Sequence, residues 1–161
     1  MSIAVGDRLP DVTFRVFDDE GIQSLSTKEI FGGKKVVLFA VPGAFTPTCH
    51  LKHLPGFIEK AGVFKQKGID TVACVAVNDP FVLDVWGKAA GAEGKVMLLS
   101  DGNCEFTNEI GMGFDGSAIG LGTRSKRYAM VVDDGVVTVL HTEDSPGVAE
   151  VSTAEAILQE V

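Results

Sequence analysis

Cys49 is the residue whose chemistry most needs an explanation, because it follows an apolar run with no second cysteine close by in the chain. The stretch VPGAFTPTCH, residues 41–50, leaves the run VVLFAV through two prolines and a glycine. A free cysteine has a pKa of about 8.5, and the start of a helix or a nearby cation lowers it toward the thiolate, which is the nucleophile. We therefore predict that this loop presents a thiolate at the first turn of a helix.

The residues just before Cys49 suit such a thiol. Thr46 lies three positions earlier, so its hydroxyl can share the same pocket or cap the helix that follows. Pro42 and Pro47 have no backbone N–H, stiffen the loop and make its wall apolar. Because a dry wall strengthens the charge interactions inside a site, this composition favours nucleophilic chemistry.

The elements that position this loop follow from the apolar pattern. Residues 34–41 form a near-continuous apolar run, as expected of a strand that is buried on both faces. A helix over 49–68 follows, which Pro55-Gly56 should kink or break. Asp79 as N-cap and Pro80 at the first helical position predict another helix. We further predict a turn at 18–21, strands at 70–77 and 95–99, a short helix at 101–109, a hairpin of 127–133 and 136–141 around Asp134-Gly135, and a last helix that a capping box opens at 152–155.

This order of elements predicts an α/β fold. The first strand–helix units should form right-handed parallel crossovers, and the final hairpin adds antiparallel strands. The result is a thioredoxin-like arrangement, in which helices flank a central mixed β-sheet. Cys49 then lies just beyond the carboxyl end of a central strand, where open α/β sheets place their sites.

Length, charge and cysteine count narrow the class of protein. The 161 residues, 45% of them hydrophobic, suit one domain over residues 1–161 with a sizeable core. A net charge of −8 argues against a nucleic-acid partner. We expect no membrane span, because no stretch reaches about 18 continuous apolar residues. The N-terminus resembles no leader, and three cysteines form no disulfide framework. We therefore expect a cytoplasmic protein or a trimmed organellar form, plastid or mitochondrial.

The residues around Cys49 match a known family. The spacing Pro42-x-x-x-Thr46-x-x-Cys49 is the active-site signature of peroxiredoxins. The runs VPGAFTPTC, HLPGF, VACVAVNDPF and RSKRYAMVVDDG are similar to the type II (atypical, five-like) subfamily, and most of all to its plant-type members. The resemblance covers essentially the whole chain. It implies a thioredoxin-fold thiol peroxidase that needs no cofactor and reduces hydrogen peroxide and alkyl hydroperoxides.

The resemblance also assigns roles to individual residues. Cys49 would be the peroxidatic cysteine, Thr46 the hydroxyl that binds peroxide, Pro42 the shield against water, and Arg127 the distal arginine. A fixed guanidinium favours the thiolate and stabilises the charge that moves onto the departing oxygen. Arg124 is the neighbouring alternative to Arg127, and we expect it to support the pocket.

The regeneration of Cys49 is left open by the sequence. Its sulfenic acid must be reduced by a second thiol. In plant-type members a cysteine at the position of Cys74 is proposed as the resolving thiol. A mid-strand thiol will not easily come within the roughly 7 Å between Cα atoms that a disulfide needs. We therefore rank direct reduction by glutaredoxin with glutathione, or by thioredoxin, above Cys74, and we expect no role for Cys104.

The two histidines after Cys49 have more than one possible role. His53 should line the pocket or bond within it, unless it only packs or caps, and His50 should face the surface and be dispensable.

The resemblance implies a homodimer, for which Phe45, Phe81 and Trp86 are interface candidates unless they are simply core residues. Cys49 and the two histidines lack the extra ligand that a zinc site needs, so we expect no metal. Two alternatives from other classes are a redox-responsive binding or chaperone protein that signals through Cys49 oxidation, and a metal-binding thioredoxin-like module.

Overall fold

The apolar run before the proline loop forms β3 (Lys35–Val41), the strand around which the sheet is built. It pairs in parallel with β4 (Thr71–Ala76) and antiparallel with β8 (Tyr128–Asp133) in the computed structural model, which describes residues 2–161. All residues of β3 after Lys35 are buried, because helices cover both faces of the sheet. The strand predicted over 34–41 is confirmed to within one residue.

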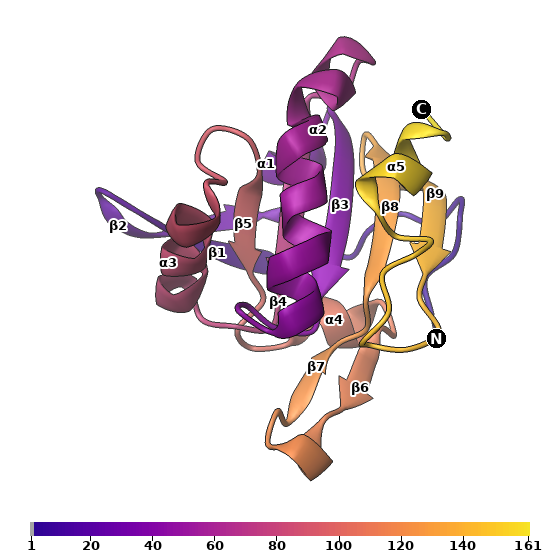
Figure 1. The fold of residues 1–161 in the computed structure, drawn as a ribbon. Coiled ribbons are helices and arrows are strands. Elements are labelled where there is room, and N and C mark those ends of the chain that lie inside the picture. The colour runs from indigo at the N-terminus through magenta and orange to yellow at the C-terminus, as the bar shows by residue number, and fades with distance from the viewer. Residues whose placement is uncertain (1) are drawn as a thin grey trace.

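The seven-stranded sheet is mixed, as the order of elements predicted. The strand order is β2-β1-β5-β4-β3-β8-β9, with β3, β4 and β5 parallel and the outer pairs antiparallel (Figure 1). The outer strands and β5 are β1 (Thr13–Asp18), β2 (Gly21–Ser26), β5 (Met97–Ser100) and β9 (Val136–Thr142). The β8–β9 hairpin turns at Asp134 and Gly135, both with positive φ, as Asp-Gly predicts.

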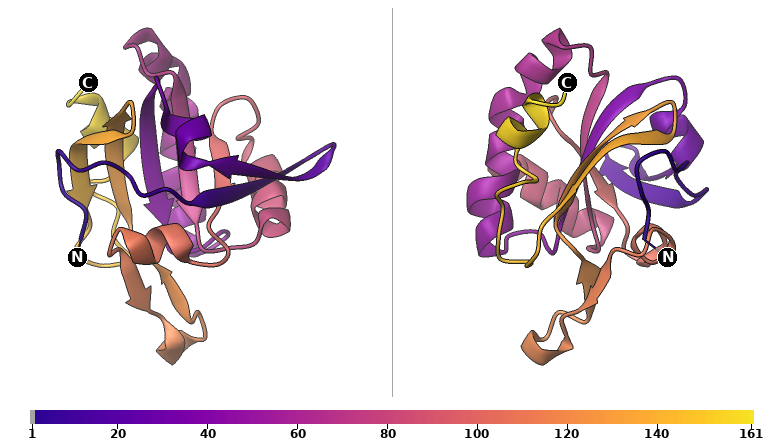
Figure 2. Two further views of the ribbon diagram at one scale, coloured as in Figure 1. Left: turned by 180° about the vertical axis from the view of Figure 1, so that it is seen from behind. Right: turned by 90° about the vertical axis from the view of Figure 1, so that its right-hand side faces the viewer.

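Alternate side chains of β3 pack into two separate hydrophobic cores, one on each face of the sheet. Val37, Phe39 and Val41 pack under α2 (Leu54–Gln66), α3 (Pro80–Ala90) and α5 (Ala154–Leu158). Val36, Leu38 and Ala40 face α1 (Thr27–Phe31) and α4 (Glu105–Glu109) on the opposite side. The edge-on view in Figure 2 shows these two helical layers with the sheet between them. The predicted helix at Asp79-Pro80 is confirmed, since the Asp79 side chain accepts from the Val82 N–H.

Some elements were missed or misplaced. The β1–β2 hairpin, α1 and the two-stranded ribbon of β6 (Gly113–Asp115) and β7 (Thr123–Ser125) were not predicted, although the turn at 18–21 was. The ribbon projects from the body and carries the short helix η2 (Ser117–Ile119) (Figure 1). The predicted capping box at 152–155 is wrong. Thr153 caps α5, while the Ser152 hydroxyl bonds to Glu143, and a true capping box of Ser26 and Glu29 opens α1.

Two helix boundaries also differ from their predictions. The short helix predicted over 101–109 begins only at Glu105, because both Asp101 carboxylate oxygens accept backbone N–H bonds from residues 106 and 107. The helix predicted over 49–68 is not broken at Pro55-Gly56, which lie in the first turn of α2. The geometry changes just before them, where Cys49–His53 form a π-helical segment, η1, and Leu54 begins α2 with an N–H that reaches back five residues to the Cys49 carbonyl. No helix of the described chain, residues 2–161, is long and apolar enough to cross a membrane.

Candidate active site

Cys49 is fully buried in the first turns of the helix that follows β3. Helical geometry begins at Pro47, so the backbone N–H groups of Thr48 and Cys49 belong to the first turn, where helices leave their donors unpaired. Proline at the first helical position suits this start, because its missing N–H would have had no helical partner. The predicted placement of Cys49, beyond a central strand and at a helix start, is confirmed.

Arg127 is brought to the sulfur by the pairing of β8 with β3. Tyr128 lies opposite Ala40, so the residue before β8 reaches the carboxyl end of β3, where the proline loop starts. The Arg127 side chain is buried, and its Nη2 donates to Cys49 Sγ at 2.9 Å. Its Nε and Nη2 also donate to the Pro146 carbonyl, at 3.1 and 3.0 Å. This contact places a fixed positive charge against the sulfur, where it can stabilise negative charge that moves during a displacement.

His53 holds the other side of the guanidinium. Its Nδ1 lies 2.8 Å from Arg127 Nη1, and its Nε2 lies 2.8 Å from the Ser152 carbonyl. Because the guanidinium can only donate, Nδ1 must accept and Nε2 must carry the proton, so the imidazole is neutral. Burial, assisted by the nearby Arg127 charge, lowers the pKa of His53 from 6.5 to about 4 although the bond to Ser152 opposes it. His53 therefore bonds within the pocket, as predicted.

Glu143 is a buried acid that sequence reasoning missed. Its Oε2 accepts from the Ser152 hydroxyl at 2.6 Å and from the backbone N–H groups of residues 150–152 at 2.8–2.9 Å. Burial raises the pKa of this carboxyl, but the bonds from Ser152 and its neighbours outweigh burial and bring the pKa below its ordinary value. Glu143 thereby fixes the segment whose carbonyl holds His53. No spacing in the sequence links residue 143 to Cys49, so no signal pointed to it.

Thr46 does not cap the helix through its side chain. Its hydroxyl donates to the Gly43 carbonyl at 2.7 Å, which leaves the oxygen's lone pairs free to accept a further bond. Arg124 lies against the same loop, where its Nη1 donates to the Pro42 carbonyl at 3.2 Å. Pro42 itself is buried. Arg124 thus contacts the loop backbone, while Arg127 contacts the sulfur.

Cys74 lies in the middle of β4, opposite Phe39 of β3, and is fully buried. Burial, and then the neighbouring Cys49, raise the pKa of this thiol well above its ordinary value. A buried thiol that resists ionisation is a poor nucleophile.

Trp86 is a core residue, which was the stated alternative to a role at an interface, and the expectation that His50 faces the surface is wrong. Trp86 has no exposed surface, so it cannot form an interface between subunits. Its Nε1 donates to His50 Nδ1 at 3.0 Å, so His50 is half-buried and bonded rather than simply surface-facing. Phe45 and Phe81 are 48% and 53% exposed, and their interface role stays a prediction.

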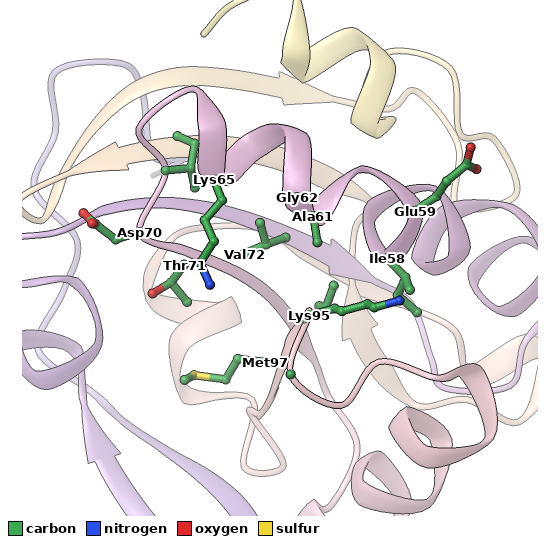
Figure 3. A pocket seen from close by; sticks show the side chains of 13 residues that line it. Ile58, Glu59, Ala61, Gly62, Lys65, Asp70, Thr71, Val72, Lys95 and Met97 are labelled. Carbon is green, nitrogen blue, oxygen red and sulfur yellow. The ribbon is translucent and has the colours of Figure 1, made fainter.

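Other parts of the molecule lie away from this chemistry. A cavity of about 660 Å³ between α2 and the amino ends of β4 and β5 contains Lys65 and Lys95 (Figure 3). Cys49 lies beyond the opposite, carboxyl ends of the strands, so this cavity does not serve it. Within residues 2–161, no group of three or more histidine, cysteine or acidic side chains is placed to hold a metal ion.

The arrangement can bind and polarise a small polar molecule at the sulfur. It combines a buried thiol, a guanidinium fixed on three sides, a free hydroxyl acceptor and first-turn N–H groups. Such preorganised donors stabilise charge that develops during a displacement, with little reorganisation.

Comparisons with known proteins show which family the chain is similar to. The Redoxin family model matches residues 4–158. Peroxiredoxin-2E, chloroplastic, of Arabidopsis thaliana is 50% identical over 162 residues, which cover 98% of this chain and 69% of the relative. Peroxiredoxin-2B of the same plant is 49% identical over 158 residues, covering 98% and 97% of the two chains. The solved structure of reduced Prx3 from Vibrio vulnificus in complex with H2O2 has a TM-score of 0.93, 49% identity and 98% coverage of both chains.

Proposed function

Because this chain belongs to the peroxiredoxins, has their thioredoxin-like fold and is a thiol-dependent peroxidase, we propose that Cys49 is the cysteine that attacks the peroxide. The observation that carries this proposal is the 2.9 Å contact between Arg127 Nη2 and Cys49 Sγ in a buried pocket. Cys74 and Cys104, the other two cysteines, have no comparable cation against their sulfur among the bonds of residues 2–161. The catalytic unit is one domain that spans residues 1–161.

The proposed reaction is an in-line displacement on a hydroperoxide, either hydrogen peroxide or an alkyl hydroperoxide. The Cys49 thiolate attacks the distal oxygen, so that an S–O bond forms while the O–O bond breaks. The electron pair leaves on the second oxygen, which takes a proton from solvent and departs as water or an alcohol. Cys49 is oxidised by two electrons to a sulfenic acid. Arg127 stabilises both sulfur and peroxide, and the Thr46 hydroxyl accepts a bond from the peroxide O–H.

We propose that an external thiol regenerates Cys49. A reductant thiol attacks the sulfenic sulfur and releases water, and a second thiol then frees Cys49 and leaves as a disulfide. The burial of Cys74 and its raised pKa argue against it as the resolving residue. Glutaredoxin with glutathione, or thioredoxin, would supply these thiols. The compartment would then be one that keeps thiols reduced, either the cytoplasm or an organelle.

We also propose that two copies of the chain form a dimer next to this site. Phe45, in the Cys49 loop, and Phe81, at the start of α3, are both exposed. Trp86 is withdrawn from this surface, but its bond to His50 supports the helix turn behind Phe45, with which the imidazole is also in contact.

The first experiment is peroxide consumption by the wild type, Cys49→Ser and Cys74→Ser, each with thioredoxin and then with glutaredoxin and glutathione. We expect no turnover from Cys49→Ser and retained turnover from Cys74→Ser. If Cys74→Ser forms the sulfenic acid but does not turn over, Cys74 is the resolving thiol. Full activity of Cys49→Ser would contradict the proposal. A protein that only signals through Cys49 would be oxidised once and consume no further peroxide with any reductant.

A further inference from the structure

A second cavity, of about 500 Å³, lies beside the Cys49 loop at the carboxyl ends of β4 and β5. Two of its lining residues touch the loop itself. The Asn78 side-chain oxygen accepts from the Ala44 N–H at 2.9 Å, and Arg124 donates to the Pro42 carbonyl at 3.2 Å. This end of the sheet is where open α/β folds bind their ligands. None of the catalytic steps above uses this cavity.

The cavity carries two guanidinium groups without acidic partners. Arg15, on β1, and Arg124, on β7, are both half-buried there and both line the space. Arg15 donates one bond, to the Thr13 carbonyl, and Arg124 donates to the Leu121 and Pro42 carbonyls. Each guanidinium has five N–H donors, so several remain on both. The ion pairs of residues 2–161 involve neither arginine.

The remaining lining offsets only part of this charge. Asp79 is the one acidic residue of the lining, and its single carboxylate, whose Oδ1 accepts from the Val82 N–H as the cap of α3, cannot balance two guanidinium groups. Asn78 and Asn103 add amide groups without charge. The cavity is therefore a locally positive site on a chain whose net charge is −8. Arginine pairs with carboxylates through two parallel bonds, so a carboxylate fits such a site best.

A short series of residue contacts connects the cavity to the reactive thiol. Arg124 and Thr46 flank the same glycine, Gly43, because a Cβ placed there would meet both side chains. Thr46 lies one helical turn before Cys49. A tripeptide spans at most about 10 Å when extended, so a small molecule anchored by its carboxylate can present a reactive group to the thiol pocket.

We propose that this cavity binds the carboxylate of a small molecule that reacts at Cys49, and that Arg15 and Arg124 are its anchors. The inference rests on the proposed function of Cys49. Two sources share this chemistry: a peptide thiol reductant such as glutathione, and a hydroperoxide that carries a carboxylate, such as a fatty-acid hydroperoxide. Hydrogen peroxide has no carboxylate, so its reaction with Cys49 does not use the cavity.

The test compares charged ligands with neutral esters in two arms. The first measures the rate of Cys49 oxidation by linoleic acid hydroperoxide and by its methyl ester. The second measures the reduction of the Cys49 sulfenic acid by glutathione and by glutathione diethyl ester. The variant is Arg15→Gln. Arg15→Lys keeps the charge, and Arg8→Gln removes an exposed arginine far from the cavity, where it contacts the Asp134 carbonyl.

We expect the wild type to prefer the charged ligand by about fivefold in at least one arm, the size of a solvent-accessible ion pair. The arm that shows the preference identifies the ligand. Arg15→Gln should bring that ratio near one, whereas Arg15→Lys should keep part of it and Arg8→Gln all of it. Oxidation by hydrogen peroxide should be the same in every variant, which shows that Cys49 itself still works. Equal rates for acid and ester in both arms of the wild type, or an unchanged ratio in Arg15→Gln, would overturn the proposal.

Discussion

The guanidinium of Arg127 and the imidazole of His53 lie 2.8 Å apart, Nη1 to Nδ1, in a buried pocket. Because Nδ1 can accept this bond only when His53 is neutral, the orientation of Arg127 depends on the protonation state of the histidine. The same guanidinium reaches Cys49 Sγ through Nη2. The reactive sulfur is therefore linked, through Arg127 and His53, to the Ser152 carbonyl and to the Glu143 carboxylate that fixes it.

Replacing Arg127 by Gln should slow the oxidation of Cys49 by hydrogen peroxide about 100-fold or more, as the loss of one preorganised donor commonly does. The measurement is stopped-flow detection of Cys49 sulfenic acid. Arg127→Lys keeps the charge but not the forked geometry, and should restore only part of the rate. Arg124→Gln is the comparison, because its side chain contacts the loop backbone and not the sulfur, so this change should slow the oxidation far less than Arg127→Gln does. An oxidation rate in Arg127→Gln equal to that of the wild type would refute the role of this arginine.

His53 can be tested with two amides that each keep one of its bonds. Asparagine places an oxygen near the position of Nδ1 and can still accept from Arg127, whereas glutamine places its N–H₂ near Nε2 and keeps only the donor to Ser152. We expect Cys49 oxidation to be slower in His53→Gln than in His53→Asn, because only the asparagine orients the guanidinium. The opposite order would mean that the bond to Ser152, not the one to Arg127, matters for the rate.

His53 should also make stability depend on pH. The folded-state pKa is about 4, below the ordinary 6.5, so the unfolded chain binds a proton at a higher pH than the folded one. Above pH 6.5 His53 is neutral in both states and costs the fold nothing. As pH falls from 6.5 to about 4, the free energy of unfolding decreases, by roughly 3 kcal/mol at most. Urea unfolding at several pH values should show this loss in the wild type. In both amide variants the free energy of unfolding should change less with pH over this range.

The sequence predicted most of the site because its signals are local. A glycine- and proline-rich loop after a buried strand identifies Cys49, Thr46 and Pro42, since these residues are adjacent in the chain. Arg127 lies 78 residues away from Cys49, and only its likeness to a family motif pointed to it. Glu143 and Ser152 gave no signal for the site, because the Glu143 carboxylate accepts mainly from backbone N–H groups and His53 bonds the backbone carbonyl of Ser152, and such bonds carry no sequence pattern.

The errors in the fold have a similar cause. The helix predicted at 101 starts later because the Asp101 side chain bonds ahead to residues 106 and 107. The Ser152 hydroxyl was expected to cap α5, but a tertiary bond to Glu143 takes it, and Thr153 supplies the cap. The sequence left Trp86 open between an interface and the core, and the fold of α3 turns it into the core, where His50 accepts its N–H. Tertiary contacts of this kind cannot be deduced from propensity alone.

Glu143→Gln should loosen the segment that holds His53. The bonds to the charged carboxylate are each worth about 1.5–3 kcal/mol, and part of this is lost with a neutral amide. The pKa of Glu143 is below its usual 4.5, so its stabilisation is present above pH 4.5 and is lost as pH falls below that value. We expect lower stability at pH 7, a weaker pH dependence below 4.5, and slower Cys49 oxidation. Thermal unfolding and stopped-flow oxidation measure both effects.

Glu150→Gln is the matched control for Glu143→Gln. It removes the same charge from the same segment, but its side chain is exposed. It should leave stability and rate unchanged. If the two variants had equal effects, the loss of negative charge, and not the loss of the bonds to residues 150–152, would explain the changes in stability and in oxidation rate.

Gly43→Ala tests how closely the Cys49 loop is packed against Arg124. A Cβ at this position would lie 2.7 Å from Arg124 Nη1 and 3.2 Å from Thr46 Cγ2. The backbone of Gly43 has no positive φ, so alanine meets only steric resistance. The end of the arginine side chain can move aside, which breaks its bond to the Pro42 carbonyl, whereas the branched side chain of Thr46 is stiff about its first torsion. We expect slower oxidation of Cys49 by hydrogen peroxide and a loss of roughly 1 kcal/mol in stability.

A double-mutant cycle separates the two contacts of that Cβ. If Arg124 is the main obstacle, Gly43→Ala and Arg124→Ala should be clearly non-additive, because the second change removes the atom that the first one strikes. Additive effects would assign the loss to Thr46 instead. Gly62→Ala, in α2, is the control for the glycine change itself. A Cβ there meets nothing within 4 Å, so helix propensity should raise stability by about 0.5–1 kcal/mol and leave the oxidation rate unchanged.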